Sequence, residues 1–162
     1  MAVTPRITPC LWFDRNAEEA ANFYVSIFNN SKITAISHYG EGSPGGAPGS
    51  VMVVGFELDG QAFTGLNGGP LFKFTEAISM IVNCETQAEV DDYWDNLTSD
   101  GGREVQCGWL KDKFGVSWQI VPTVLPELMQ SNDPAKSKAV MAALMQMVKL
   151  DIAAPKRAFE NA

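Results

Sequence analysis

Side chains that commonly carry out catalysis are few in this sequence and lie far apart. His38 is the only histidine among 162 residues. A histidine-rich zinc site needs several such ligands, and one histidine near the end of an expected strand gives little support to a Ser-His-Asp triad. Both mechanisms are therefore nearly excluded within one chain. We expect His38 to be a solvated or hydrogen-bonded side chain.

The three cysteines, Cys10, Cys84 and Cys107, are the other candidate nucleophiles. Their odd number and the lack of C-x-x-C spacing are typical of free thiols in a reducing compartment. Cys10 or Cys107 could attack a substrate as a thiolate, although no histidine lies near either in the sequence to activate it. An enzyme that uses one of these cysteines therefore stays open as an alternative.

A glycine-rich run, GEGSPGGAPG at residues 40–49, has the composition of a phosphate-binding loop. Such loops need amide groups that converge at the start of a helix, usually with a lysine before a serine or threonine. This run has two prolines and no such lysine, and it lies between two expected strands, so we predict a mobile hairpin loop. The sequence has no strand-glycine-helix unit, which leaves a Rossmann-type cofactor site, including one for adenosylmethionine, unsupported.

Four tryptophans, at positions 12, 94, 109 and 118, could shape a pocket. Trp94 belongs to an expected helical core stripe, and the other three lie in expected strands. Because side chains alternate across a strand, Trp12 and Trp109 can face the side opposite to their neighbours, and large aromatic side chains inside a curved sheet often line pockets. Core packing is the alternative for each of them.

The charge balance disfavours several classes of partner. Twelve basic and nineteen acidic side chains give a net charge of −7, which disfavours contact with phosphate backbones and with anionic lipid headgroups. No apolar run approaches the roughly 18 residues of a membrane span, and the N-terminus lacks a basic-then-apolar signal pattern. Together with the cysteine usage, this predicts a cytoplasmic protein without nucleic-acid or membrane partners.

Hydrophobic periodicity predicts the same order of elements in both halves of the chain. The first half reads as a strand, a helix capped by Asn16 with Glu19, and three strands, of which the last two meet at an Asp59-Gly60 turn. The second half reads as a strand, a helix capped by Thr86 with Glu89, and further strands. The expected strands cover residues 3–13, 33–39, 51–58, 61–66, 77–84, 103–111 and 116–121. We expect the acidic run between Glu89 and Asp95 to form a solvated helix face.

The chain becomes helical after Pro122. Asp133 and Pro134 are suited to begin a helix, and an apolar stripe continues to about Leu150. The stripe consists of Val140, Met141, Leu144, Met145 and Val148. It must be covered by the sheet of its own chain or by a second copy, and we favour a partner subunit for at least part of it. An adaptable methionine-lined groove is the alternative.

The run from Cys107 to Pro122, CGWLKDKFGVSWQIVP, resembles the signature of the PhnB-like proteins. These are also labelled 3-demethylubiquinone-9 methyltransferase-like and belong to the glyoxalase/bleomycin-resistance, or vicinal oxygen chelate, superfamily. Shorter similar stretches cover residues 16–28, 78–92 and 149–153, so the resemblance spans nearly the whole chain.

The resemblance implies an α+β fold of two βαβββ modules that form half-open curved sheets, followed by C-terminal helices. We expect one domain over residues 1–162, with modules at about 1–70 and 71–124 and a helical segment at about 125–162. Proteins of this kind usually pair as homodimers, and their cups hold a small molecule or a metal.

The four metal-ligand positions of glyoxalase-type enzymes fall here, by resemblance, near Thr8 or Cys10 and on Thr64, Ser79 and Gln119. None of these is a histidine or a carboxylate, and neutral oxygens bind transition metals poorly. We therefore expect no metal and no other cofactor at this place.

These arguments predict a homodimeric protein whose cups bind a small organic ligand without a metal, drug sequestration being one possible form. The residues expected to face the ligand are Trp12, Thr64, Ser79, Trp109 and Gln119. Two alternatives stay open. One is an enzyme that acts by a non-metal mechanism or with a metal bound elsewhere, and the other is an interaction module whose cups are filled by its own side chains.

Overall fold

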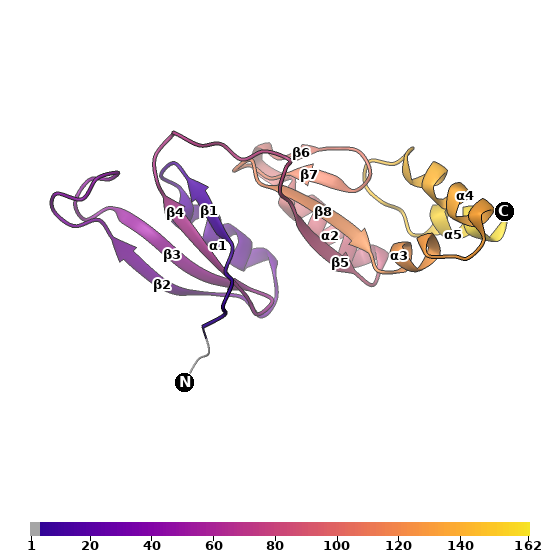
Figure 1. The fold of residues 1–162 in the computed structure, drawn as a ribbon, viewed down its shortest axis with the longest axis horizontal. Helices are drawn as coiled ribbons and strands as arrows, with labels where there is room; N and C mark the ends of the chain where they lie inside the picture. The colour runs from indigo at the N-terminus through magenta and orange to yellow at the C-terminus, as the bar shows by residue number, and fades with distance from the viewer. Residues whose placement is uncertain (1–3) are drawn as a thin grey trace. The chain divides into compact units, whose positions relative to one another are not determined.

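The expected order of a strand, a helix and three strands occurs twice, once in the unit that ends at Phe74 and once in the unit that begins at Thr75 (Figure 1). This computed structural model describes residues 4–162. Each unit contains one four-stranded sheet, in which the first strand of the unit pairs in parallel with its last strand. The sequence therefore predicted the repeat correctly.

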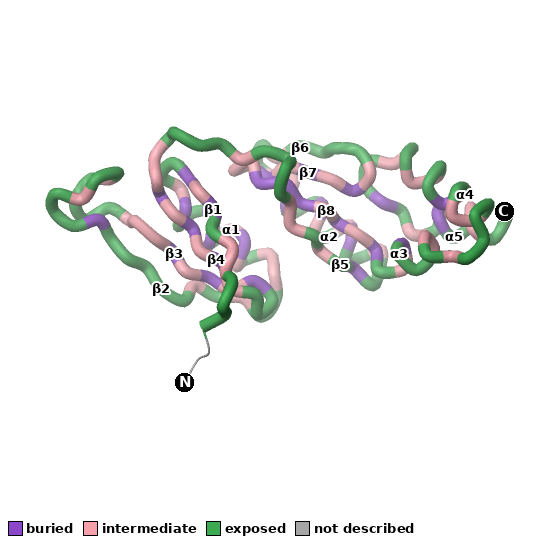
Figure 2. The backbone as a smooth tube through the Cα atoms, in the orientation of Figure 1, coloured by how far each residue is buried: buried purple, intermediate pink, exposed green. Residues whose placement is uncertain are grey.

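The first unit forms a sheet of strand order β1-β4-β3-β2. Its elements are β1 (Cys10–Phe13), α1 (Ala17–Ile27), β2 (Lys32–His38), β3 (Val51–Leu58) and β4 (Gln61–Asn67). β1 is shorter than the expected strand over residues 3–13, of which residue 3 lies outside the described residues. Pro5 and Pro9 explain the shortening, because proline has no N–H to donate to a neighbouring strand. β2 lies at the edge of the sheet and is almost entirely exposed (Figure 2).

Helix α1 covers one side of the first sheet with three alanines and Tyr24, all of them buried. The ring of Tyr24 packs against the ring of Phe56, with 6.3 Å between their centroids, and Phe56 stacks on Phe63 with 5.5 Å between centroids. Small side chains on the helix let it approach the sheet closely, and the aromatic rings fill the remaining space. The other side of this sheet is left free of α1.

The start of α1 differs from the sequence prediction. Asn16 occupies the N-cap position but makes no side-chain capping bond. The N–H of Ala17 donates instead to Oδ1 of Asn67, at 2.8 Å. Since β4 runs parallel to β1, its last residue lies beside the start of the helix that follows β1. A residue 50 positions away thus provides the cap, and local spacing could not reveal it.

The second unit forms a sheet of strand order β5-β8-β7-β6. Its elements are β5 (Met80–Cys84), α2 (Gln87–Leu97), the 3-10 turn η1 (Ser99–Gly101), β6 (Arg103–Glu104), β7 (Trp109–Lys111) and β8 (Ser117–Pro122). The capping box of Thr86 and Glu89 is confirmed. The expected strand over 103–111 is split into β6 and β7, because Cys107 and Gly108 both have positive φ, at 60° and 80°, and reverse the chain.

Three helices follow β8 and pack against one another: α3 (Val124–Met129), α4 (Pro134–Leu144) and α5 (Ala153–Glu160). They share a cluster around the buried Leu125, Val140 and Leu150. Asp133 caps α4 as predicted, since its carboxylate accepts from the N–H of Ala135 at 3.0 Å. α4 ends earlier than expected, however, and α5 lies within the helical segment expected over 125–162, although its bounds were not predicted. None of the described helices is long and apolar enough to span a membrane.

The predicted apolar stripe of the C-terminal region splits into two parts. Val140 is fully buried and Leu144 packs against the same cluster. Met141, Met145 and Val148 are exposed in this chain. Val140 and Leu144 thus belong to the chain's own core, whereas the two methionines and Val148 lie at its surface.

A buried carboxylate closes the turn between β7 and β8. Oδ1 of Asp112 accepts from the N–H groups of Phe114, at 2.9 Å, and Val116, at 3.0 Å. Its Oδ2 accepts from Nε1 of Trp118 at 2.9 Å. Asp112 is only 3% exposed. The three donors satisfy a charge that would otherwise be costly to bury, and they connect the turn to the core of the second sheet.

We predict that Asp112→Ala lowers the free energy of unfolding by about 3 kcal/mol or more, because it leaves buried donors without an acceptor. Asp112→Asn should lower the free energy of unfolding by about 1–2 kcal/mol. The amide keeps one acceptor oxygen, but its NH₂ group replaces the second acceptor and faces a donor. Urea unfolding followed by tryptophan fluorescence measures both. The control is Asp92→Ala on the exposed face of α2, which should change stability by about 0.5 kcal/mol at most. Equal effects at positions 92 and 112 would contradict this account.

Candidate functional site

The side of the second sheet that faces away from α2 carries most of the residues predicted to bind a ligand. Strand alternation places the buried Leu110, Trp118 and Ile120 on the side of the helix. Gln119 therefore points to the opposite side, where Ile81 of β5 and Trp109 of β7 are its direct neighbours. The name second-sheet face is used below for Ser79, Ile81, Trp109, Ser117 and Gln119.

Polar contacts on the second-sheet face connect two of the predicted residues. Nε2 of Gln119 donates to Oγ of Ser79 at 2.9 Å. Trp109 pairs with Gln119 across the strands, so its half-buried indole lies beside this amide. The structure therefore brings Ser79, Trp109 and Gln119 together, as an aromatic surface next to neutral hydrogen-bonding groups.

Ser117 is a residue of this face that sequence reasoning missed. It lies two positions before Gln119 in β8 and so shares its side of the sheet. Its hydroxyl is buried and has no hydrogen-bond partner among residues 4–162. Buried polar atoms normally have partners, but Ser117 is only 1% exposed, so its hydroxyl is covered by protein and a bound molecule reaches it only if the side chains around it move. A serine in a strand carries no sequence signal that would have identified it.

An ion pair lies at the border of the same face. Lys111 of β7 pairs with Ser117 across the strands, and its Nζ is 2.5 Å from Oε1 of Glu76. The hydrogen bond from Lys111 lowers the pKa of the Glu76 carboxyl from its ordinary value. The charge of Lys111 is therefore already paired, and the centre of the face remains neutral.

Trp12 and Thr64 lie in the first unit, on the side of its sheet opposite to α1. Thr64 pairs with Cys10, and Trp12 pairs with Leu66. The indole N–H of Trp12 donates to the carbonyl of Gly69 at 2.9 Å, and its ring meets Phe72 edge-on at 4.9 Å. The structure thus forms two groups of predicted residues, one on each sheet. Through these contacts with Gly69 and Phe72, Trp12 also anchors the chain that follows β4.

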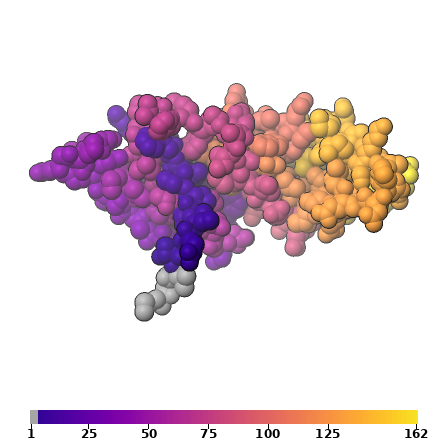
Figure 3. Space-filling view, viewed as in Figure 1, coloured from indigo at the N-terminus to yellow at the C-terminus, as the bar shows by residue number. Residues whose placement is uncertain are grey.

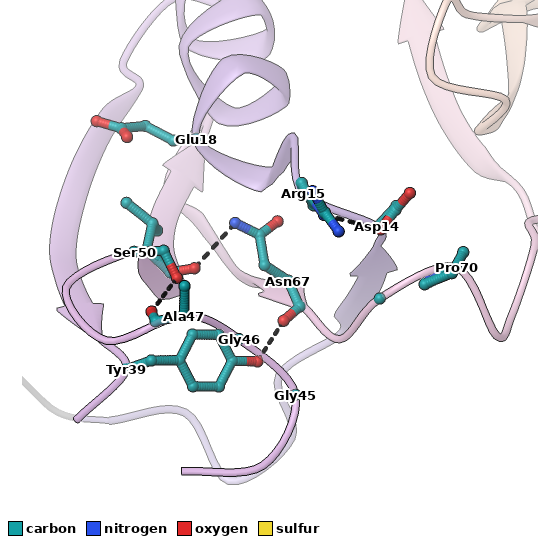
Figure 4. A pocket seen from close by; sticks show the side chains of 12 residues that line it. Asp14, Arg15, Glu18, Tyr39, Gly45, Gly46, Ala47, Ser50, Asn67 and Pro70 are labelled. Carbon is teal, nitrogen blue, oxygen red and sulfur yellow. Dashed lines mark hydrogen bonds and ion pairs between the residues drawn. The ribbon is translucent and has the colours of Figure 1, made fainter. Parts of the chain in front are cut away.

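A cavity of about 390 Å³ lies in the first unit, at the strand ends beside the start of α1 (Figure 4). The Tyr39 hydroxyl donates to the carbonyl of Asn67, and Nδ2 of Asn67 donates to the carbonyl of Val51 at 3.1 Å. The predicted ligand residues do not line it. Its lining residues are Asp14, Arg15, Glu18, Tyr39, Gly45, Gly46, Ala47, Ser50, Val51, Asn67, Gly69 and Pro70.

The glycine-rich run forms one wall of this cavity. It is the loop of the β2–β3 hairpin, as predicted, and it projects from the first unit (Figure 3). A Cβ on Gly46 would lie 2.2 Å from the ring of Tyr39, so only glycine allows the backbone to pack on that ring. The glycine at this position is explained by packing on an aromatic ring. Sequence reasoning singled out neither Tyr39 nor Asn67.

Comparison with known proteins identifies the family. The family model described as 3-demethylubiquinone-9 3-methyltransferase matches residues 5–121. The solved structure of the PhnB protein from Bacillus cereus is 40% identical, with a TM-score of 0.67, and the match covers 74% of this chain and all of that one. The chain belongs to the PhnB-like family. No curated protein matched it.

More distant structures show the fold of this PhnB-like chain. Protein PA1353 from Pseudomonas aeruginosa is 22% identical, with a TM-score of 0.60, over 74% of this chain and 98% of that one. The fosfomycin resistance protein FosX from Listeria monocytogenes, solved with Mn(II) and sulfate, is 15% identical, with a TM-score of 0.53, over 80% and 98%. The two-module α+β fold of the glyoxalase/bleomycin-resistance superfamily, expected from the sequence, is thereby confirmed.

The donor atoms of this PhnB-like chain do not fit the metal that the fold implies. Its ligand positions, carried over by resemblance, are Thr8 or Cys10, Thr64, Ser79 and Gln119, which offer hydroxyls, an amide and one thiol. Partial burial raises the pKa of the Cys10 thiol, so a thiolate is disfavoured there. Neutral oxygen donors hold transition metals poorly. Among residues 4–162, no group of three or more His, Cys, Asp or Glu side chains is placed to hold a metal ion.

The three thiols differ in their surroundings. Burial raises the pKa of the Cys84 thiol to about 11, with a further contribution from the charge of Glu89. Cys107 is partly exposed, and its Sγ lies 3.7 Å from the carbonyl of Leu144 and 3.8 Å from Sδ of Met145. Neither Cys10 nor Cys84 is thus activated as a nucleophile.

We predict that iodoacetamide at pH 8 modifies Cys107 first, Cys10 more slowly and Cys84 negligibly in the folded protein. With a pKa of about 11, Cys84 would be a thiolate in roughly one molecule in a thousand at this pH. Peptide mass mapping over time measures the three rates, and labelling in urea serves as the control in which they should converge. Rapid labelling of Cys84 in the folded chain would contradict the burial seen here.

Proposed function

We propose that this PhnB-like protein binds a small organic molecule on the second-sheet face, without a metal of the glyoxalase type. The observation that carries the proposal is the hydrogen bond between Gln119 and Ser79, next to the half-buried indole of Trp109. On the first sheet, Trp12 and Thr64 are the equivalent aromatic and hydroxyl groups, and each sheet presents its own group.

The chemistry of the face favours a neutral or cationic molecule with a flat apolar part. The indole of Trp109 offers area for stacking, whereas the polar groups can fix the orientation of a ligand. Gln119 donates to Ser79 through its amide nitrogen, so its carboxamide oxygen can accept from the ligand. The net charge of −7 also favours cations over anions.

Ligand binding accounts for the site better than the methyl transfer in the family description. Nucleotide-type cofactors bind where a glycine-rich loop leads from a strand into a helix. The glycine-rich loop of this chain joins the antiparallel strands β2 and β3, and α1 follows β1 through Asp14, Arg15 and Asn16. Drug sequestration is one form that the proposed binding could take.

We further propose that the protein is a cytoplasmic homodimer. The exposed Met141, Met145 and Val148 form an apolar surface that a second copy could cover, and the three cysteines are free. The alternative is an enzyme that acts by a non-metal mechanism or with a metal bound elsewhere. The raised pKa of the Cys10 thiol disfavours the version in which Cys10 is the nucleophile.

Native mass spectrometry of protein purified without chelator or added metal tests the proposal. We expect a dimer that retains an organic molecule and carries no stoichiometric metal. Gln119→Ala and Trp109→Ala should each reduce the retained fraction about tenfold or more, the effect of losing one good polar or stacking contact. Gln130→Ala, at an exposed glutamine of the same unit, is the matched control and should retain the molecule.

Three results would contradict the proposal. They are one metal ion per subunit, a retained molecule that is insensitive to both substitutions, and wild-type protein that carries no organic molecule even after rapid purification in dilute buffer. The first of these would favour the enzyme alternative.

A further inference from the structure

We infer that residues 147–152 position Trp109 for ligand binding, because they hold the turn that precedes it. Gln87 is the positioning residue that keeps this segment in place. The inference rests on the proposed function of the second-sheet face. The name docking segment is used below for residues 147–152, which connect α4 to α5 and lie beside the β6–β7 loop (Figure 1).

The turn before Trp109 has an unfavourable conformation for its sequence. Cys107 and Gly108 occupy its two central positions with φ of 60° and 80°, and the N–H of Trp109 donates to the carbonyl of Gln106 at 3.2 Å. Turns of this type prefer asparagine or glycine at the first central position. A cysteine there needs support from outside the turn.

The docking segment gives that support through its main chain. The N–H of Cys107 donates to the carbonyl of Met147 at 2.9 Å, and the N–H of Gly108 donates to that of Val148 at 2.8 Å. Both central N–H groups of the turn are thus occupied by acceptors from the same segment. On the other side, the carbonyl of Gly108 accepts from the N–H of Ile120 at 2.8 Å. The turn is therefore held between the docking segment and β8.

Close packing reinforces these bonds. A Cβ on Gly108 would lie 2.8 Å from Cδ1 of Leu150, so the glycine lets this buried side chain rest directly on the turn. Leu150 belongs to the cluster that α3, α4 and α5 share. The position of the turn is consequently connected to the packing of the C-terminal helices.

The side-chain amide of Gln87, the first residue of α2, binds both a carbonyl and an N–H group of the docking segment, as the main chain of a neighbouring strand does. Its Nε2 donates to the carbonyl of Leu150 at 3.0 Å, and its Oε1 accepts from the N–H of Ile152 at 2.9 Å. Lys149 adds an ion pair with Asp91 at 2.9 Å. Asp91 was expected to be solvated with the rest of its acidic run, but it binds both Lys149 and the amide of Gln87. An exposed pair of this kind contributes little alone, so the amide of Gln87 is the main anchor.

This arrangement connects a region beyond the residues matched by the family model to the proposed site. The match ends at residue 121, whereas both acceptors for the turn come from residues 147 and 148. Trp109 follows the turn directly and pairs with Gln119. Release of the docking segment should therefore let the turn relax and displace the indole from the second-sheet face.

Fluorine NMR of the full-length protein labelled with 5-fluorotryptophan tests the structural step without any ligand. Trp109→Phe assigns the resonance of Trp109. Gln87→Ala should shift or broaden that resonance and should reduce the hydrogen-exchange protection of the Cys107 and Gly108 amides about tenfold or more. The resonance of Trp12, in the first unit, should not change. Gln130→Ala, at an exposed glutamine of the same unit that lies outside the docking segment, is the matched control and should leave all resonances in place.

Two further variants keep the test decisive if Gln87→Ala folds poorly. Gln87→Glu keeps an acceptor for Ile152 but turns a carboxylate oxygen toward the carbonyl of Leu150 and the carboxylate of Asp91, so its effect should be in the same direction and at least as large. Leu150→Ala removes the side chain that rests on Gly108 and should also move the Trp109 resonance. An unchanged Trp109 resonance, in a variant whose Ile152 amide has lost protection, would overturn the inference.

Native mass spectrometry of the same variants tests the consequence for binding. We expect Gln87→Ala to retain several-fold less of the organic molecule than wild type. A displaced Trp109 resonance with undiminished retention would overturn the claim that the docking segment positions Trp109 for binding. If wild-type protein retains nothing, the proposed function fails, while the NMR result still decides whether the docking segment controls the turn.

Discussion

The structure depends on one constraint that acts twice, the parallel pairing of the first and last strands of each unit. β1 pairs with β4, and β5 pairs with β8. Between them the chain must return over the sheet, and in each unit a helix of eleven residues lies in that return. The helix covers one side of the sheet, and the side chains of every second strand residue are buried beneath it. The opposite side is left to the residues between them, among which Thr64 and Gln119 are found.

The register of strand pairing places the candidate-site residues beside one another. Gln119 stands between Ile81 and Trp109, and a slip of one residue would exchange it for the core residues Trp118 or Ile120. The carboxylate of Asp112 fixes the turn that sets the pairing of β7 with β8, and the turn at Cys107 and Gly108 fixes where β7 begins. The neutral groups at Ser79, Ser117 and Gln119 are therefore held by charged and strained groups that lie outside the face itself.

The sequence predicted the elements whose determinants are local. The Asp59-Gly60 turn, the capping box at Thr86 and the strand over 51–58 all follow from short spacing rules. It did not predict contacts made by distant residues. Asn67 replaces Asn16 as the cap of α1, and Gln87 binds a segment more than sixty residues away. For the site, the resemblance and strand alternation gave Ser79, Trp109 and Gln119, whereas Ser117 needed the structure, because a missing hydrogen-bond partner leaves no trace in a sequence.

The central claim is that the second-sheet face holds an organic molecule through Trp109 and Gln119 and uses no metal. A crystal structure of the full chain, purified without chelator or added metal, tests it most directly. The account predicts electron density for an organic molecule that stacks on the indole of Trp109 and is hydrogen-bonded to the carboxamide of Gln119. A metal ion bound at Ser79 and Gln119, or a face filled by the protein's own side chains, would contradict it.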